Sequence, residues 1–79
     1  MDVKQKAANA RTLLANETFK GVLEDIKNDQ IKVFLTSSST DAVAREDAYS
    51  TVSAIKKIEH YLQSCINDEK MFDSKNKTN

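Results

Sequence analysis

Proline is absent from this 79-residue chain, and Gly21 is its single glycine. Proline and glycine are the residues that most often end helices, form tight turns and separate strands. We therefore expect helices joined by short polar segments, and an all-α fold. A chain of this length suffices for one domain with a thin core, because such a chain buries only about 60% of its unfolded surface.

Three segments place apolar residues at the three- and four-residue spacing of an amphipathic helix. The first segment ends near Asn16, which can either adopt a left-handed conformation there or cap the next helix. The second extends to about Leu35, with Gln30 falling inside its apolar stripe, and the third runs from about Asp41 to about Lys70. The apolar positions are, in chain order, Val3, Ala7, Ala10, Leu13 and Leu14, then Phe19, Val22, Leu23, Ile26, Val33 and Phe34, then Ala44, Ala48, Val52, Ile55, Ile58, Leu62 and Ile66.

The run TSSSTD separates the second and third segments. Its side chains compete for backbone hydrogen bonds, and Ser39, Thr40 or Asp41 is available to cap the third helix. We predict an antiparallel helical hairpin with an additional N-terminal helix, which makes a small three-helix protein. Residues 1–70 are expected to form its single domain and residues 71–79 a polar, frayed tail.

The second helix is expected to be apolar on two sides, because Ile31 and Leu35 lie well away from its main stripe. The second side needs a cover, either the first helix or another chain. Gly21 inside a helix costs roughly 1 kcal/mol relative to alanine, which favours close contact with another backbone at that position. We expect Gly21 to meet Ala7 and Ala10, the small residues of the first helix.

That arrangement leaves Ile31 and Leu35 exposed, and we predict that they contact another chain. Tyr49 and Tyr61 lie off the stripe of the third helix, so they either cover its edges or contribute to an interface, where tyrosine is enriched. We include them with Ile31 and Leu35 as candidate interface residues. The apolar surface of so short a chain also indicates self-association into a homo-oligomer.

The stretch KKIEHYLQSC contains the only histidine, His60, and the only cysteine, Cys65. Five residues on a helix separate two side chains by about 140°, so neither residue can activate the other or share a metal ion with it. The sequence contains no zinc-binding spacing and no glycine-rich phosphate loop. We predict no catalytic residue, no metal and no cofactor, and therefore that the chain is not an enzyme.

Two charged residues are expected to have structural roles. Glu59 lies near the middle of an apolar stripe, where a carboxylate needs a partner. The partner is either the free N–H groups at residues 16–19, which we expect opposite Glu59, or a lysine or arginine. Arg45 lies at the edge of the same stripe, and we expect it to face Gln30 and Ile31 on the second helix.

The charges of the chain balance, with 12 lysines and arginines against 12 aspartates and glutamates. A neutral chain without a basic stripe gives no electrostatic reason to expect direct binding to nucleic acid or to an anionic membrane. A single cysteine and the absence of an apolar N-terminal run predict synthesis in a reducing cytoplasm. Any partner is expected to be a protein that is recognised locally.

Three short motifs resemble a kind of small helical protein found in tailed bacteriophages. They are a Leu-Leu-Asn-x-x-Phe start, from which this chain departs by the intervening Ala15, an Arg-Glu-x-x-Tyr centre and a closing His-x-Leu, and the likeness covers about residues 10–66. The matching positions are Leu14, Asn16 and Phe19, then Arg45, Glu46 and Tyr49, then His60 and Leu62.

The resemblance implies a non-enzymatic structural or assembly component of the virion that binds other proteins. The alternative is a soluble phage effector that binds and inhibits a host protein, and a third possibility is a subunit that completes the active site of an enzyme. The expected location is accordingly the virion or the host cytoplasm, and the expected partner is a phage structural protein or a host protein.

Overall fold

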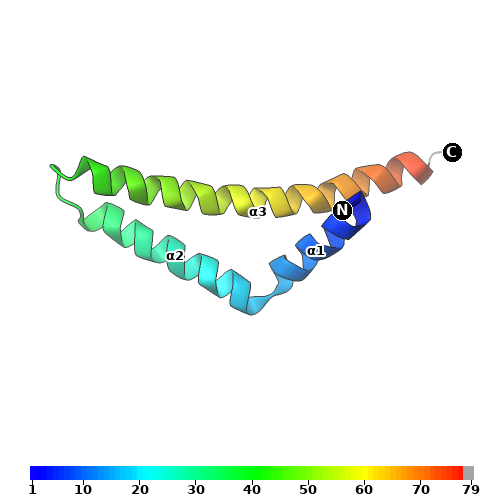
Figure 1. The fold of residues 1–79 in the computed structure, drawn as a ribbon, viewed down its shortest axis with the longest axis horizontal. Coiled ribbons are helices and arrows are strands. Elements are labelled where there is room, and N and C mark those ends of the chain that lie inside the picture. The colour runs from blue at the N-terminus through cyan, green and yellow to red at the C-terminus, as the bar shows by residue number, and fades with distance from the viewer. Residues whose placement is uncertain (78–79) are drawn as a thin grey trace.

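The computed structural model describes residues 1–77 and consists of three helices, α1 (Val3–Ala15), α2 (Glu17–Thr36) and α3 (Ala42–Lys77). The helices α2 and α3 form an antiparallel hairpin, and α1 precedes α2 along the same side of α3 (Figure 1). Both shorter helices pack on the one long helix, and they contact each other less. The predicted all-α fold, a hairpin with an additional N-terminal helix, is therefore confirmed.

Side-chain caps fix the start of each helix. Asp2 Oδ1 accepts a hydrogen bond from the Gln5 N–H at 2.7 Å, and Asp41 Oδ1 accepts one from the Ala44 N–H at 3.2 Å. Asn16 has an extended backbone, with φ of −80° and ψ of 115°, and its Oδ1 accepts from the Phe19 N–H at 2.8 Å. Of the two conformations left open for Asn16, the chain therefore adopts the one that caps α2.

Small residues bring α1 close to α3. Ala7 and Ala10 are almost fully buried, and Ala10 packs with Leu62 and Cys65 of α3. The chain then bends at Asn16, so that the junction of α1 and α2 stands farther from α3 than the far ends of these helices do (Figure 1). Larger side chains fill the wider space: Leu14 and Phe19 pack on the cluster of Ala10, Leu62 and Cys65. The size of the packed side chains thus increases with the distance between the helices, from alanine to phenylalanine.

Gly21 does not take part in this close contact, and that prediction is wrong. It is exposed, and no atom outside its own stretch of helix lies within 4 Å of the position that a Cβ would occupy. The reason is angular, since Gly21 lies about 160° away from the buried Leu23 around the helix. The structure offers no packing reason for a glycine at this position.

The buried stripe of α2 is rotated from the predicted one. Its side facing α3 includes the half-buried Lys27 and Gln30 beside Leu23, whereas Val22 and Val33 are exposed at its edge. Gln30 was expected inside the stripe, but Lys27 was not, because apolar periodicity does not detect a lysine that covers apolar surface with its methylene groups. Ile26 and, on α3, Ile58 are likewise exposed although their positions predicted burial.

The predicted end of the third helix near Lys70 is also wrong, because α3 continues to Lys77. The segment after Lys70 contains neither proline nor glycine to stop a helix. It also contacts the first turn of α1, where Lys4 Nζ lies 3.5 Å from Asp73 Oδ1. The expected tail is therefore helical as far as Lys77, and residues 78 and 79 lie outside the described part.

The three helices make an extended body rather than a rounded one. Its principal extents are 61 × 23 × 17 Å and its radius of gyration is 17.3 Å, against about 12 Å for a compact domain of this length. The accessible surface is 5959 Å², against roughly 4,800 Å² for a compact monomer of this mass. One layer of helices thus leaves a large apolar area in contact with solvent.

Replacing Ala10 with leucine tests the close contact of α1 with α3. The added atoms have no space between the helices, so Ala10→Leu is expected to lower the free energy of unfolding by about 1 to 3 kcal/mol. Ala8→Leu, on the exposed side of the same helix, is the matched control and should change it little. Urea unfolding followed by circular dichroism makes the comparison, and equal effects of the two variants would contradict the packing.

Candidate functional site

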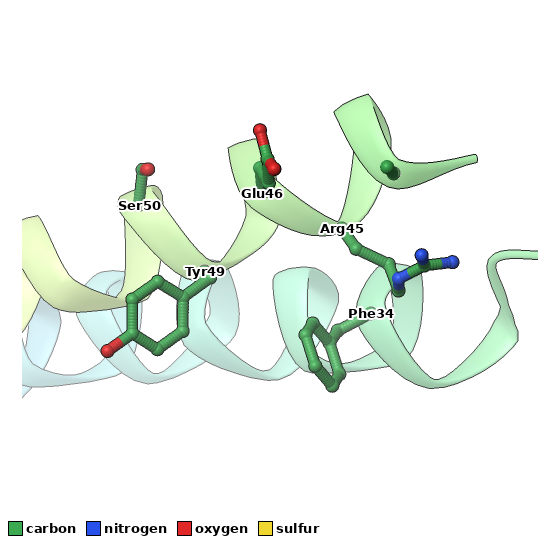
Figure 2. Close-up of a pocket in the computed structure, with 6 residues that line it drawn as sticks. Phe34, Arg45, Glu46, Tyr49 and Ser50 are labelled. Carbon is green, nitrogen blue, oxygen red and sulfur yellow. The ribbon is translucent and has the colours of Figure 1, made fainter. Parts of the chain in front are cut away.

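Two apolar grooves lie between α2 and α3 in the half of the hairpin nearest the turn. One has a volume of about 250 Å³ and is lined by Gln30, Ile31, Phe34, Ala48, Tyr49, Val52 and Lys56. The other, of about 450 Å³, lies closer to the turn and is lined by Phe34, Ala42, Arg45, Glu46, Tyr49 and Ser50 (Figure 2). Phe34 and Tyr49 belong to both, so the two grooves form one continuous surface.

Four large apolar side chains, Ile31, Phe34, Leu35 and Tyr49, are exposed on this surface, which we call the hairpin face. Leu35 is 73% exposed and Tyr49 is 68% exposed. Leu35 follows Ile31 by one helical turn and so extends the same side of α2. In Figure 2 the rings of Phe34 and Tyr49 lie on the same side of the hairpin, while Glu46 and Ser50 point away from α2. The hairpin face thus combines an apolar centre with a charged rim.

The structure brings together three of the four predicted interface residues. Ile31 and Tyr49 line one groove, and Leu35 lies beside them. Tyr61 is exposed as well, but it lies about 120° around α3 from Tyr49 and does not belong to the hairpin face. Phe34 was missed as an interface residue because its periodicity placed it in the stripe. Its position three residues after Ile31 was the available signal.

A second exposed apolar edge occurs on the other side of the hairpin. It includes Val22, Ile26 and Val33 of α2, together with Ile58 and Tyr61 of α3. On α2 these residues lie on the side of Leu23 opposite to Ile31 and Leu35. Apolar periodicity predicts burial for Val22, Ile26, Val33 and Ile58, so this second edge was not foreseen.

Glu59 pairs with a lysine, the second of its two expected partners. Lys27 Nζ lies 3.3 Å from Glu59 Oε1 and 3.5 Å from its Oε2, and it also lies 2.9 Å from Glu24 Oε1. The predicted position of Glu59 opposite residues 16–19 is wrong. The register of the hairpin sets Lys27 against Glu59, and Asn16 already supplies the acceptor for the N–H of Phe19.

The side chain of Lys27 is only 17% exposed, whereas that of Glu59 is 36% exposed. The hydrogen bond to Glu24 raises the pKa of Lys27 above its ordinary value of 10.5, and the hydrogen bond to Glu59 adds to this, against the opposing effect of partial burial. Lys27 is therefore held in its charged form between two carboxylates at the middle of the hairpin.

Arg45 holds the turn rather than the partner helix, so its predicted contact with Gln30 and Ile31 is wrong. Its Nη1 donates a hydrogen bond to the carbonyl of Ser38, and its Nη2 donates one to the carbonyl of Ser39 at 3.4 Å. Carbonyls at the end of a hairpin lack helical partners and attract a guanidinium. Arg45 thereby fixes the turn and forms one end of the groove.

Two further ion pairs link α1 to α3. Arg11 Nη1 lies 2.7 Å from Glu69 Oε1, and the side chain of Glu69 is largely covered. Lys4 and Asp73 make the other pair, nearer the end of α3. Together with Lys27 and Glu59 on the hairpin, these pairs place cations of the shorter helices against acids of α3.

The two reactive residue types do not form a site. His60 is exposed, whereas Cys65 is buried against α1 with Ala10. Among residues 1–77 no group of three or more histidine, cysteine, aspartate or glutamate side chains is arranged to hold a metal ion. In the same residues, no helix combines the length and the apolar character needed to cross a membrane.

Comparison of the chain with protein-family models, curated proteins and solved structures finds no match.

Raising the pH above the pKa of Lys27 is expected to lower the free energy of unfolding. Because the pKa of Lys27 is raised on folding, its stabilisation is fully present below pH 10.5 and is lost as the pH rises through the higher folded-state value. Lys27→Arg keeps its charge in that range, so it should lose less stability than the wild type. Urea unfolding at a series of pH values measures both, and equal losses would show that the Lys27 pair does not matter.

Proposed function

We propose that this chain is a non-enzymatic protein-binding component of a phage, acting in virion structure or assembly, that docks on other protein chains and associates with itself. The observation that carries the proposal is the hairpin face, where Ile31, Phe34, Leu35 and Tyr49 are exposed around continuous grooves. The apolar and aromatic character of the hairpin face and its exposure to solvent both favour a protein partner.

The composition of the hairpin face supports a protein partner. Protein interfaces commonly have an aromatic and aliphatic centre, depleted of charge, and a polar rim. Here Phe34 and Tyr49 are central, and Arg45, Glu46 and Lys56 lie at the margins. Removing one such large side chain from water is worth about 1.5 to 3 kcal/mol, which a one-layer hairpin cannot gain alone.

A non-enzymatic role is supported by the character of the interior. Among the described residues, every buried side chain is apolar or is the thiol of Cys65, and no polar or charged residue is buried. Catalytic acids, bases and nucleophiles depend on groups whose surroundings change their proton affinity within a cleft. The single raised pKa, that of Lys27, belongs to an ion pair that joins two helices.

The resemblance of Leu14, Asn16 and Phe19, and of Arg45, Glu46 and Tyr49, to small phage proteins favours a virion component. In this structure two of those residues have local roles, since Asn16 caps α2 and Arg45 holds the turn. A soluble effector that blocks a host protein remains the second candidate, because such a protein needs an exposed docking surface too.

Charging the hairpin face is expected to abolish association without unfolding the chain. In Ile31→Glu combined with Leu35→Lys, two exposed apolar contacts are lost at no change in net charge. If both side chains are covered in the complex, their loss costs about 3 to 6 kcal/mol of binding free energy. Light scattering measures the association, and circular dichroism should show an unchanged helix content.

The matched control for this variant is Thr18→Glu combined with Thr36→Lys, which makes the same charge change at exposed positions on another side of α2. The control should associate like the wild type. An unfolded Ile31 and Leu35 variant, together with a monomeric wild type, would instead place these residues in the core of the monomer.

Location separates the two candidate functions. A virion component should be present in purified phage particles at a fixed ratio to the major structural proteins, as quantitative mass spectrometry can measure. The hairpin-face variant should be depleted from those particles, whereas the threonine control should not. Absence of the wild-type chain from the particles, with its recovery on one host protein, would favour the effector instead.

A further inference from the structure

The layer of helices has two broad faces, and each carries one of the two exposed apolar surfaces (Figure 1). Ile31 of the hairpin face lies about 160° around α2 from Val33, and Tyr49 lies about 180° around α3 from Ile58. The hairpin face and the second edge therefore point in opposite directions. The second edge consists of Val22, Ile26, Val33, Ile58 and Tyr61.

Positive charge borders the hairpin face. On α3, Arg45 precedes Tyr49 by four residues and Lys56 follows it by seven, so both cations lie on the same side of that helix as Tyr49. Each of them lines one of the two grooves. Within residues 1–77, neither forms an ion pair with a carboxylate. Glu46 also lines the groove nearer the turn, but it points away from α2 (Figure 2).

Negative charge borders the second edge. On α2, Asp29 follows Ile26 by three residues and precedes Val33 by four, so it lies between them on the same side of the helix. On α3, Asp47 lies within about 20° of Ile58 around the helix. Both aspartates are exposed, and neither forms an ion pair in the described part of the chain.

The other charges between residues 25 and 57 do not offset this difference. Lys27 is held in its ion pairs, and Asp41 caps α3. Four more charges, two of each sign, lie on the backs of the two helices, within about 20° of the direction opposite to Leu23 on α2 and Ile55 on α3. These four are Asp25, Lys32, Glu46 and Lys57. The two faces of this half of the hairpin thus carry opposite charge, although the whole chain is neutral.

Opposite charges on the two faces favour contact between unlike faces. Two copies joined through their hairpin faces set Arg45 and Lys56 of one copy near those of the other, and like charges facing each other are unfavourable. Two copies joined through their second edges bring aspartates together in the same way. Contact of a hairpin face with a second edge instead brings cations to aspartates and one apolar centre to another. Each such contact leaves one free face at either end, so it can repeat.

The exposed area is sufficient for such contacts. The accessible surface of 5959 Å² exceeds that of a compact monomer of this mass by roughly 1,100 Å². An interface of standard size removes about 800 Å² from each partner. Covering one face therefore removes most of the excess, and covering both faces of a copy removes all of it.

We propose that the hairpin face of one copy of this chain binds the second edge of the next copy, so that the copies stack head to tail into a ring or a filament. The inference rests on the self-association in the proposed function and assigns to it two different, complementary faces. Charge and apolar character both select this contact, because each face finds its opposite charge only on the other one.

Two face variants distinguish this stacking from a symmetric dimer. Ile31→Glu with Leu35→Lys disrupts the hairpin face and keeps the second edge. Ile58→Glu with Tyr61→Lys does the reverse, at side chains that are 46% and 58% exposed. Each variant alone lacks one of the two surfaces and should be monomeric. Their mixture offers one intact surface of each kind and should form a 1:1 dimer that does not grow.

Size-exclusion chromatography with light scattering measures these states. The wild-type chain should form species larger than a dimer as its concentration rises. Circular dichroism should show the helix content of the wild type in both face variants.

Charge reversal at exposed positions tests the same contact without changing its apolar centre. Lys56→Glu places an acid on the hairpin face, and Asp47→Lys places a base on the second edge. Each variant alone is expected to associate about tenfold more weakly at low salt, with a smaller effect at high salt. Mixed together, the two variants again bring opposite charges to every contact and should associate like the wild type. The control, Glu46→Lys with Lys57→Glu, exchanges two charges on the back of α3 and should have no effect.

An Ile58 and Tyr61 variant that dimerises alone would show a symmetric contact of hairpin faces and would overturn the stacking. The same conclusion follows from a mixture of face variants that stays monomeric, from charge reversals that have no effect or are not rescued by mixing, and from a wild-type chain that is monomeric at every concentration. The proposed binding function fails separately, if the Ile31 and Leu35 variant enters phage particles as the wild type does.

Discussion

The packing of the one long helix, α3, against both shorter helices is the contact on which the rest of the structure depends. Neither α1 nor α2 has another surface on which to cover its apolar side, since they touch each other little. Ala7 and Ala10 set the close approach at one end, and Arg45 fixes the turn at the other. Between these points the chain bends at Asn16, and larger side chains fill the wider space.

A helix that serves as the support for two others leaves the assembly one layer thick. That geometry explains why the exposed area is high and why large apolar side chains remain on both sides of the hairpin. In this geometry the side chains packed between the helices differ from those exposed on the hairpin face. The residues between the helices hold the fold, whereas the side chains of Ile31, Leu35 and Tyr49 remain exposed to solvent.

Local sequence signals predicted the helices correctly where a residue and its near neighbours along the chain decide the backbone conformation. The lack of proline, the break at TSSSTD and the capping residues Asn16 and Asp41 placed the helices and their order. Ile31 and Leu35 were recognised as off the stripe by angle alone. Periodicity failed for Val22 and Val33, because it counts apolar residues and overlooks the covered methylene groups of Lys27.

The sequence by itself determined that this protein is a hairpin of helices with one more helix before it, because helix formation and capping depend on residues within a few positions of each other. Only the tertiary structure decided that Glu59 meets Lys27, that Gly21 faces solvent and that Tyr61 lies apart from Tyr49. These outcomes depend on the register and rotation of one helix against another. They arise from the sum of many side-chain contacts far apart in the chain, which no short stretch of sequence contains.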